Sequence, residues 1–423
     1  MDYLKHTSGI RRILILPGMH SMKILIYGIN FSPELTGIGK FTGEMAEWFA
    51  KNQNNVKVVT AVPYYPQWKI HENYKNFYQK EKAENIEIIR CPLYVPSKPN
   101  TFRRLVHLLS FSLSSFFPIL RLFFWKPDLI IQVSPTLFCS LQTIILAKIC
   151  RAKSILHIQD FEVDAMFNIT LSGRKRFKDF AFWIEKIILK NFDFVSTISD
   201  AMIKRLKVKG IPDEVIVSLP NWANIDDFKD AQRDESLLDE LDIDKNKRIV
   251  LYSGNMGEKQ GLEIVIHTAK DMESYEDIQF LMIGDGSSKE RLKKLSASID
   301  AKNIKFLPLQ PYENLPKILA SASCHLIVQK TEAADIVFPS KLVNILAVGG
   351  NSVATASKDS SLGRVYIENE GIGVLLETQS IFDLRNSILK AIEMKTPNQA
   401  AINYAEKNLG KEEILTRFIT EVI

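Results

Sequence analysis

The sequence has few cysteines, and their arrangement points neither to a metal site nor to a disulfide framework. Its four cysteines lie scattered in apolar stretches, with no C-x-x-C pair and no histidine at zinc-ligand spacing: Cys91, Cys139, Cys150 and Cys324. We therefore expect buried free thiols in a reducing compartment, which favours the cytoplasm.

The chain also lacks a convincing signal peptide or membrane span. Residues 1–21 contain only the short apolar core ILIL and no cleavage site. Because Met22 opens the strand-like run KILIYG directly, we expect translation to start there, with residues 1–21 untranslated or dispensable. The uncharged stretch Leu108–Leu120 is 13 residues long and contains Pro118, so it is too short and broken for a spanning helix.

Acidic residues are scarce in the first half of the chain. The net charge is +10 from Met22 to Val215 and −7 from Ile216 to Ile423, within a total of +5. The first half should therefore meet something anionic, such as a membrane surface or a phosphorylated substrate. No basic helix with interleaved aromatics supports a nucleic-acid partner.

Short apolar runs alternate with helical stretches from Met22 onward. In the first half the predicted strands are Lys23–Ile29, Val56–Val62, Ile86–Cys91, Asp128–Val133, Ser154–Ile158, Phe194–Ile198 and Val215–Leu219. The predicted helices between them include Lys40–Asn52, Leu137–Cys150, Lys175–Asn191 and Asp200–Lys207. Such Val-, Ile- and Leu-rich strands separated by helices indicate parallel strands buried on both faces.

A polar, acidic segment follows Trp222, and then the alternation restarts. The predicted strands are Arg248–Ser253, Gln279–Ile283, Lys305–Pro308, Cys324–Val328, Ser352–Thr355 and Val374–Leu376. The predicted helices are Leu262–Met272, Lys289–Ala297, Leu315–Ala322 and Lys341–Val348. The pattern predicts an α/β protein of two tandem Rossmann-like, doubly wound domains that face each other across a cleft.

The predicted domain boundaries follow from this alternation. We expect an N-terminal extension over residues 1–21, a first domain over 22–222 and a second over 223–400. Helices over 401–423 are candidates for a crossing back to the first domain.

One apolar segment, Thr101–Trp125, interrupts the alternation. Basic residues flank it at both ends. Three alternatives stay open: a long core helix, a membrane-spanning helix, or a helix that docks on a membrane interface, with its apolar face in lipid and its basic residues on headgroups. The basic run Gly173–Lys178 supports a nearby anionic surface.

The stretch PELTGIGKFTGEMAEW joins a predicted strand to a helix through glycines. A dinucleotide-binding loop needs G-x-G-x-x-G and an acidic residue that ends the second strand. Here one extra residue separates Gly39 from Gly43, and the second strand ends TAVPYYP without an acid. We predict instead that Gly37 and Gly39 expose backbone amides to phosphate or hydroxyl oxygens, and that Gly43 lets the helix pack closely.

A second polar cluster, SILHIQDFEVDAM, follows another predicted strand. His157 and Asp160 fall at its carboxyl end, where ligands of such sheets bind, and we predict a functional role for both. Loop solvation and helix capping account for Glu162 and Asp164.

The second half carries three further candidate elements. YSGNMGEKQGLE offers glycines that leave the backbone open, together with Lys259, and LMIGDGSSKERL ends a strand in Gly284-Asp285-Gly286. FPSKLVNILAVGG starts a helix with Ser340 and Lys341. A lysine in the first turn opposes the helix dipole unless an anion lies there.

Together these stretches resemble the retaining glycosyltransferases of GT-B fold in family 4, and most of all the colanic-acid-type exopolysaccharide branch. The resemblance runs from Met22 almost to the end of the chain. Its motifs are YGINFSPELTGIGKFTGEMAEW, HIQDFEVDAMF, LPNWAN, YSGNMGEKQGLE and PSKLVNILAVGGN. It implies transfer of a sugar from a GDP- or UDP-sugar, with GDP-fucose as one candidate, to a lipid-linked or growing glycan. It also implies a protein peripherally bound to the cytoplasmic membrane, with no other cofactor.

The resemblance also assigns roles to residues. Those implied to hold or shape the donor site are Gly37, Gly39, Gly254, Asn255, Lys259, Gly284, Asp285, Gly286, Ser340, Lys341 and Asn344. His157 and Asp160 would line the acceptor and sugar side. The chain departs from the family where it has Asn255 in place of an arginine, and Ile336 and Asn344 in place of two glutamates. These departures affect the expected ribose and sugar contacts.

The implied chemistry develops positive charge on the sugar and negative charge on the leaving diphosphate. Lys259, Lys341 and the helix amino terminus would stabilise the diphosphate. No D-x-D motif ends a strand, so a metal is not expected. Two other hypotheses fit the pattern: a sugar-nucleotide epimerase of the same architecture, and a non-catalytic, membrane-docked nucleotide-sugar-binding protein.

Overall fold

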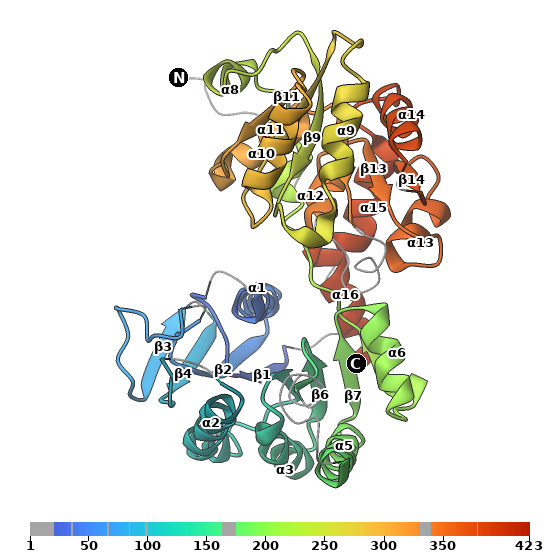
Figure 1. Ribbon diagram of the computed structural model, residues 1–423. Helices are drawn as coiled ribbons and strands as arrows, with labels where there is room; N and C mark the ends of the chain where they lie inside the picture. The colour runs from blue at the N-terminus through green and yellow to red at the C-terminus, as the bar shows by residue number, and fades with distance from the viewer. Residues whose placement is uncertain are drawn as a thin grey trace, which may run out of the picture. The chain divides into compact units, whose positions relative to one another are not determined.

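The computed structural model describes residues 21–34, 37–65, 67–83, 85–97, 100–162, 175–329, 340–378 and 380–423. The chain divides into two compact units (Figure 1). The first comprises the described residues up to Ile198 together with Leu206–Val217, and the second comprises Ser199–Arg205 together with Ser218–Ile423. Residues 1–20, which include the predicted extension, lie outside the described residues.

The first unit is built on an eight-stranded sheet in the order β3-β4-β2-β1-β5-β6-β7-β8. Its strands are β1 Lys23–Gly28, β2 Asn55–Ala61, β3 Gln79–Ala83, β4 Ile86–Cys91, β5 Leu129–Ser134, β6 Lys153–Ile158, β7 Phe194–Thr197 and β8 Ile216–Ser218. Its helices are α1 Gly37–Lys51, α2 Thr101–Arg121, η1 Leu137–Cys139, α3 Ser140–Cys150, α5 Lys175–Leu189 and η2 Asp213–Val215, and the residues of α6 Asp200–Val208 are divided between the two units.

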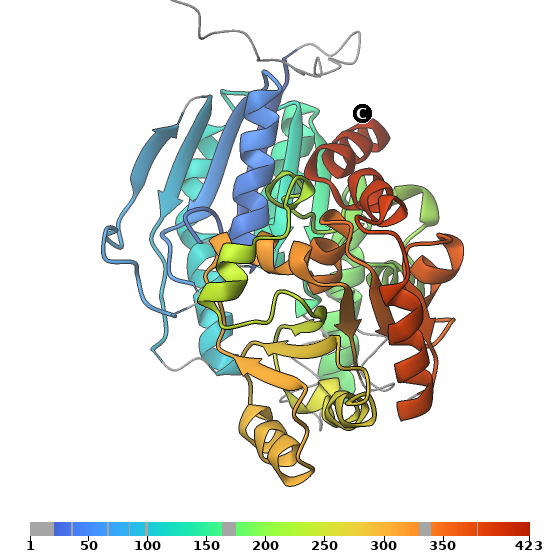
Figure 2. The ribbon, with the colours of Figure 1, turned by 90° about the horizontal axis from the view of Figure 1, so that it is seen from above.

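Helices cover both faces of the first sheet, as right-handed crossovers between parallel strands require. Helix α1 lies on one face, and α2, α3 and α5 lie on the other (Figure 1). Figure 2 shows α1 running across the near face of the strands. Strands β1, β2, β5 and β6 are buried almost throughout, because they have helices on both sides.

The second unit has a six-stranded sheet in the order β11-β10-β9-β12-β13-β14. Its strands are β9 Arg248–Ser253, β10 Ile278–Ile283, β11 Ile304–Leu307, β12 Cys324–Ile327, β13 Ser352–Thr355 and β14 Val374–Leu376. Its helices are α7 Asp226–Lys229, α8 Glu235–Glu240, η3 Glu258–Gln260, α9 Glu263–Asp271, α10 Lys289–Ser298, η4 Tyr312–Asn314, α11 Leu315–Ser321, α12 Ser340–Ala347, α13 Ser361–Glu368, α14 Ile381–Ile392, α15 Gln399–Leu409 and α16 Lys411–Val422.

Two hydrophobic cores, one on each face, hold this second sheet. Helices α9, α10 and α14 pack on one face, and α8, α11, α12, α13 and α15 pack on the other. Each neighbouring pair of strands in this sheet is parallel. The predicted architecture of two Rossmann-like, doubly wound α/β units is therefore confirmed.

Most of the predicted strands and helices match the structure to within a residue or two, but β3 was not predicted. Its sequence QKEKA is polar and largely exposed, so it lacks the apolar alternation that marks a strand. It pairs antiparallel with β4, and Arg90 on β4 donates two hydrogen bonds to the Glu81 carboxylate, at 2.5 and 3.0 Å. This strand therefore depends on its contacts with β4 and not on its own sequence pattern.

All four cysteines are free. Cys91, Cys139 and Cys324 are buried and Cys150 is half-buried, so the predicted buried thiols are confirmed at three positions. Burial raises the pKa of Cys91 and of Cys139 to about 12, which keeps both thiols protonated and unreactive.

Candidate functional site

The glycine stretch of the first unit forms the amino end of α1. The helix begins at Gly37, three residues earlier than predicted, and Gly37 has a φ of +62°, which favours glycine. A Cβ on Gly39 would lie 2.7 Å from the Glu34 side chain, and one on Gly43 would lie 2.8 Å from Cβ of Ser32. Gly39 and Gly43 therefore let the helix approach the loop after β1. The predicted contact of Gly37 and Gly39 with a ligand stays a prediction.

Glu34 organises this loop, although the sequence analysis overlooked it. Its carboxylate is buried and accepts hydrogen bonds from the Asn30 amide at 2.9 Å and from the backbone N–H groups of Tyr64 and Tyr65 at 3.2 and 3.1 Å. Burial raises its pKa. The sequence signal for this role is a carboxylate inside a glycine-rich loop. In the structure, the Glu34 carboxylate joins the loops that follow β1 and β2.

A second buried side chain, Arg90, fixes the same loop from the sheet. Besides its two bonds to Glu81, the guanidinium donates to the backbone carbonyl oxygen of Ser32 at 2.7 Å. It also lies 4.9 Å from the centre of the Tyr74 ring. A buried arginine with these partners holds β3, β4 and the loop after β1 in one arrangement.

His157 and Asp160 have different environments. His157 lies within β6, is 3% exposed, and its Nδ1 is 3.0 Å from the Ser196 hydroxyl on β7. Burial lowers its pKa to about 3, so the imidazole is neutral at physiological pH. Asp160 is exposed on the loop that follows β6. The role of both residues toward a sugar stays a prediction.

Glu162 lies at the carboxyl ends of two neighbouring strands. It accepts hydrogen bonds from the Ser134 hydroxyl at 2.9 Å and from the backbone N–H of Leu137, the first residue of η1, at 3.0 Å. Its carboxyl group is desolvated, which raises its pKa to about 7. The carboxylate thus caps η1, in line with the predicted capping, and the residue is half-buried. Asp164 lies outside the described residues.

In the second unit, the loops after β9 and β10 pack directly on one another through glycines. A Cβ on Gly284 would overlap the carbonyl oxygen of Gly254, and one on Gly286 would lie 2.5 Å from Oδ1 of Asn255. All three glycines have positive φ values between 143° and 151°. At Gly284 and Gly286 both the backbone conformation and the space therefore exclude larger residues, whereas at Gly254 the backbone conformation alone disfavours them.

Backbone hydrogen bonds join the same two loops. The N–H of Gly254 donates to Ile283 at 2.9 Å, and the N–H of Met256 donates to the carbonyl oxygen of Asp285 at 2.7 Å. Glu258 of η3 accepts a hydrogen bond from the Ser288 hydroxyl at 2.8 Å. Predicted residues Gly254, Asn255 and Gly284–Gly286 are thus brought together at the carboxyl ends of adjacent parallel strands.

Lys341 joins this group from the first turn of α12. Its Cδ lies 3.8 Å from the position of a Cβ on Gly254, and its Nζ lies 4.0 Å from the centre of the Tyr252 ring. Burial lowers the pKa of Lys341 to about 7. Among the described residues, no carboxylate forms an ion pair with it.

Tyr252 was missed by the sequence analysis, although it directly precedes the glycine turn. Its hydroxyl donates to the carbonyl oxygen of Asn255 at 2.6 Å, which fixes the ring beneath the lysine. A cation above an aromatic face is stabilised even without an anion. Asn344 follows one turn later on α12 and is half-buried. The side chains of Lys259 in η3 and Ser340 in α12, and all of Ile336, lie outside the described part of the chain.

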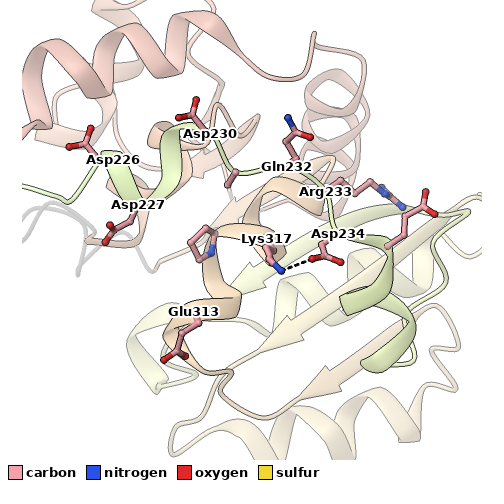
Figure 3. A pocket seen from close by; sticks show the side chains of 11 residues that line it. Asp226, Asp227, Asp230, Gln232, Arg233, Asp234, Glu313 and Lys317 are labelled. Atoms are coloured by element: carbon pink, nitrogen blue, oxygen red, sulfur yellow. Dashed lines mark ion pairs between the residues drawn. The ribbon is translucent and has the colours of Figure 1, made fainter. Parts of the chain in front are cut away.

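An open acidic pocket of the second unit involves none of these residues (Figure 3). Its lining comes from α7, the segment up to the start of α8, and the η4–α11 region, and it includes Asp226, Asp227, Asp230 and Glu313. Lys317 is already paired with Asp234 at 2.6 Å. Because like charges repel, this pocket is poorly suited to a diphosphate.

The two doubly wound units have the architecture of GT-B proteins, and the comparisons with known proteins identify the chain as a glycosyltransferase. Residues 36–222 match the model of the glycosyl transferase 4-like domain, and residues 234–408 match that of glycosyl transferases group 1. The chain is 47% identical over 407 residues to the colanic acid biosynthesis glycosyl transferase WcaI of Escherichia coli K12, covering 95% of this chain and 100% of that one. It therefore belongs to this glycosyltransferase family.

Solved structures show the same fold at low sequence identity. A glycosyltransferase from Rickettsia africae superposes with a TM-score of 0.66 at 16% identity, covering 95% of this chain and 98% of that one. HepE of Anabaena, solved in complex with UDP, gives 0.61 at 15% identity over 94% of this chain and 99% of that one.

Proposed function

We propose that this glycosyltransferase moves a sugar from a GDP- or UDP-sugar to a lipid-linked or growing polysaccharide acceptor in exopolysaccharide biosynthesis. The similarity to WcaI supports the pathway, and the UDP bound in the HepE structure supports a nucleotide-sugar donor. The single observation that carries the proposal is Lys341, a half-buried lysine whose ammonium group lies above Tyr252 and beside the glycine loops.

The environment of Lys341 suits a leaving diphosphate. A diphosphate beside Nζ would restore the charged form that burial disfavours. Backbone N–H groups at the start of α12 would donate to the same oxygens, with Lys259 as a second cation. As the bond to the sugar breaks, negative charge grows on the diphosphate, and these donors stabilise it more than the ground state.

The transfer proceeds with retention and without a metal ion in this proposal. The acceptor hydroxyl attacks the face of the sugar from which the diphosphate leaves, and a diphosphate oxygen accepts its proton. The bond from the anomeric carbon to the diphosphate breaks, and a bond to the acceptor oxygen forms. The anomeric configuration of the product, determined by NMR, and the rate in excess EDTA test these two points.

In this proposal the protein is a peripheral protein at the inner surface of the cytoplasmic membrane, because its lipid-linked acceptor is anchored there. None of the helices in the described part of the chain combines the length and the apolar character needed to cross a bilayer. The excess of basic residues in the first half supports an anionic membrane surface as its partner.

A panel of nucleotide-sugars, with and without lipid-linked acceptor, tests the proposal. Acceptor-dependent transfer or slow donor hydrolysis supports it. Donor isomerisation would instead indicate an epimerase, and binding without turnover would indicate a scaffold. Lys341→Ala should abolish turnover at an unchanged melting temperature, and unchanged kinetics would refute the assignment of this lysine to the diphosphate.

A further inference from the structure

Helix α2 turns Ser112 and Ser115 toward the protein, beside the buried Phe111 and Ile119, and turns mostly apolar side chains toward solvent. The Ser112 hydroxyl donates to the carbonyl oxygen of Phe138 at 3.0 Å, and Ser115 lies 2.5 Å from the Tyr27 hydroxyl. Gln142 of α3 donates to the carbonyl oxygen of Ser112 at 2.7 Å and accepts from Tyr27 at 2.8 Å. A surface helix of a protein in water shows the opposite arrangement.

The exposed face of α2 is a continuous apolar stripe. Its members recur three or four residues apart and are 37% to 73% exposed: Phe102, Val106, Leu109, Leu113, Phe116, Phe117 and Leu120. Transfer of such side chains from water to an apolar environment is favourable, roughly in proportion to the apolar area that is buried. We therefore expect a partner or a membrane to bury this stripe.

Helices α3 and α5 carry matching stripes. On α3 the exposed side chains are Leu141, Ile145 and Ile149, and on α5 they are Phe180, Trp183, Ile184 and Ile187. Phe180 and Trp183 stack, with ring centres 5.9 Å apart. All three helices lie on the same face of the first sheet (Figure 1), and most of the exposed large hydrophobic side chains that the structure describes belong to this three-helix face or its margins.

Basic residues predominate on the three-helix face, although α5 also carries the exposed Asp179. Helix α2 has Arg103, Arg104 and Arg121 and no acidic residue, and α3 has Lys148 and no acidic residue. On α5, Glu185 is 3% exposed and is paired with Lys209 at 2.5 Å, so it faces inward. An apolar surface with basic residues matches the interface of an anionic bilayer, where apolar groups enter the acyl boundary and cations meet headgroups.

We infer that the three-helix face, and not α2 alone, is the surface by which this protein lies on an anionic phospholipid membrane. The stripes of α2, α3 and α5 enter the lipid together, and Trp183 reaches the headgroup region. The inference deepens the proposed membrane location and rests on it. Because lipid binding is measured without donor or acceptor, a failure of this surface is distinguishable from a failure of the proposed reaction.

The test is sedimentation of the full chain with vesicles of phosphatidylcholine, with and without about one third phosphatidylglycerol. Three double variants each remove part of one stripe: Leu113→Ser with Phe117→Ser, Leu141→Ser with Ile145→Ser, and Trp183→Ser with Ile187→Ser. Each should weaken binding by about tenfold or more. Leu309→Ser with Phe382→Ser, equally exposed in the second unit at 72% and 60%, is the matched control and should bind as the wild type does.

Two further measurements locate the contact. Brominated lipids should quench Trp183 fluorescence in the wild type, and Trp183→Phe should lose that component. Lys148→Glu with Lys186→Glu should weaken binding only to vesicles that contain phosphatidylglycerol. Wild-type binding by both the α3 and the α5 variants would overturn the inference. So would a lipid-free dimer that these variants convert to monomers, because the face would then be covered by a second copy of the chain.

Discussion

A nucleotide-sugar should bind this protein less tightly as the pH rises from 7 to 8.5, because Lys341 loses its proton over that range. Burial above the Tyr252 ring lowers the lysine pKa to about 7 in the free protein. A bound diphosphate raises it again, because the anion favours the charged form. Donor binding is therefore coupled to the uptake of a proton above pH 7.

The size of the effect follows from the two protonation states. At pH 7 about half of the molecules carry a charged Lys341, and at pH 8.5 only about 3% do. If only the charged form binds the diphosphate, the apparent Kd rises about 15-fold over this interval, which corresponds to about 1.6 kcal/mol. Below pH 7 the lysine is largely charged and the affinity should level off.

Isothermal titration calorimetry with an intact nucleotide-sugar measures this directly. Its diphosphate is esterified at both ends and has no proton to lose in this range. Repeating the titration at pH 8.5 in buffers of different ionisation enthalpy should give an uptake of about one proton per donor. Lys341→Arg is the control, because arginine stays charged throughout and should show a nearly flat profile.

Two results would refute the reasoning. A wild-type affinity that stays constant between pH 7 and 8.5 would show that Lys341 does not meet the diphosphate. An equally steep profile in Lys341→Arg would assign the titration to another group.

Three further predictions concern the framework of the site. Gly284→Ala should lower the melting temperature and remove donor binding, because its Cβ would overlap the Gly254 carbonyl oxygen and its φ of +143° adds about 1–3 kcal/mol of strain; an unchanged melting curve would contradict this packing. Arg90→Met should lower the free energy of unfolding in urea by about 3 kcal/mol, because it leaves Glu81 and the carbonyl partners of the guanidinium unpaired. A loss below about 1 kcal/mol would show that the Arg90–Glu81 ion pair behaves as a solvent-exposed pair. His157 has a pKa of about 3 in the folded protein, so below about pH 6.5 it takes up a proton on unfolding. The wild type should therefore lose up to about 1.4 kcal/mol of its free energy of unfolding per pH unit, and His157→Gln should lose less in urea titrations from pH 6.5 to 4. Equal slopes for the two proteins would mean that the imidazole titrates normally.

Local pattern was sufficient to predict most of the architecture. Parallel strands buried on both faces are apolar along most of their length, so runs such as KILIYG and IQFLMI can be recognised as strands from the sequence. Glycines that follow such strands mark the points where a loop needs a positive φ, as at Gly254 and Gly284. The first turn of α12 could be predicted as an anion site because a lysine there is unfavourable by itself.

Other features depended on contacts between distant residues and left no local pattern. Strand β3 is polar and exists because Arg90 and β4 hold it. The burial of Glu34 depends on loops after two different strands, which lie about thirty residues apart in the chain. The ring of Tyr252 under Lys341 joins residues 252 and 341, which no spacing rule connects.

The segment Thr101–Trp125 shows the division most clearly. Its composition identified an apolar helix with basic ends, and left open whether the core or a membrane takes its apolar side chains. The answer depends on which face of the helix meets the sheet. The hydroxyls of Ser112 and Ser115 find partners on α3, η1 and β1, so their face of the helix is turned inward and the apolar stripe is left outside. Periodicity determines that a helix has two faces, whereas the neighbours that its polar groups can reach in the folded chain decide which face is buried.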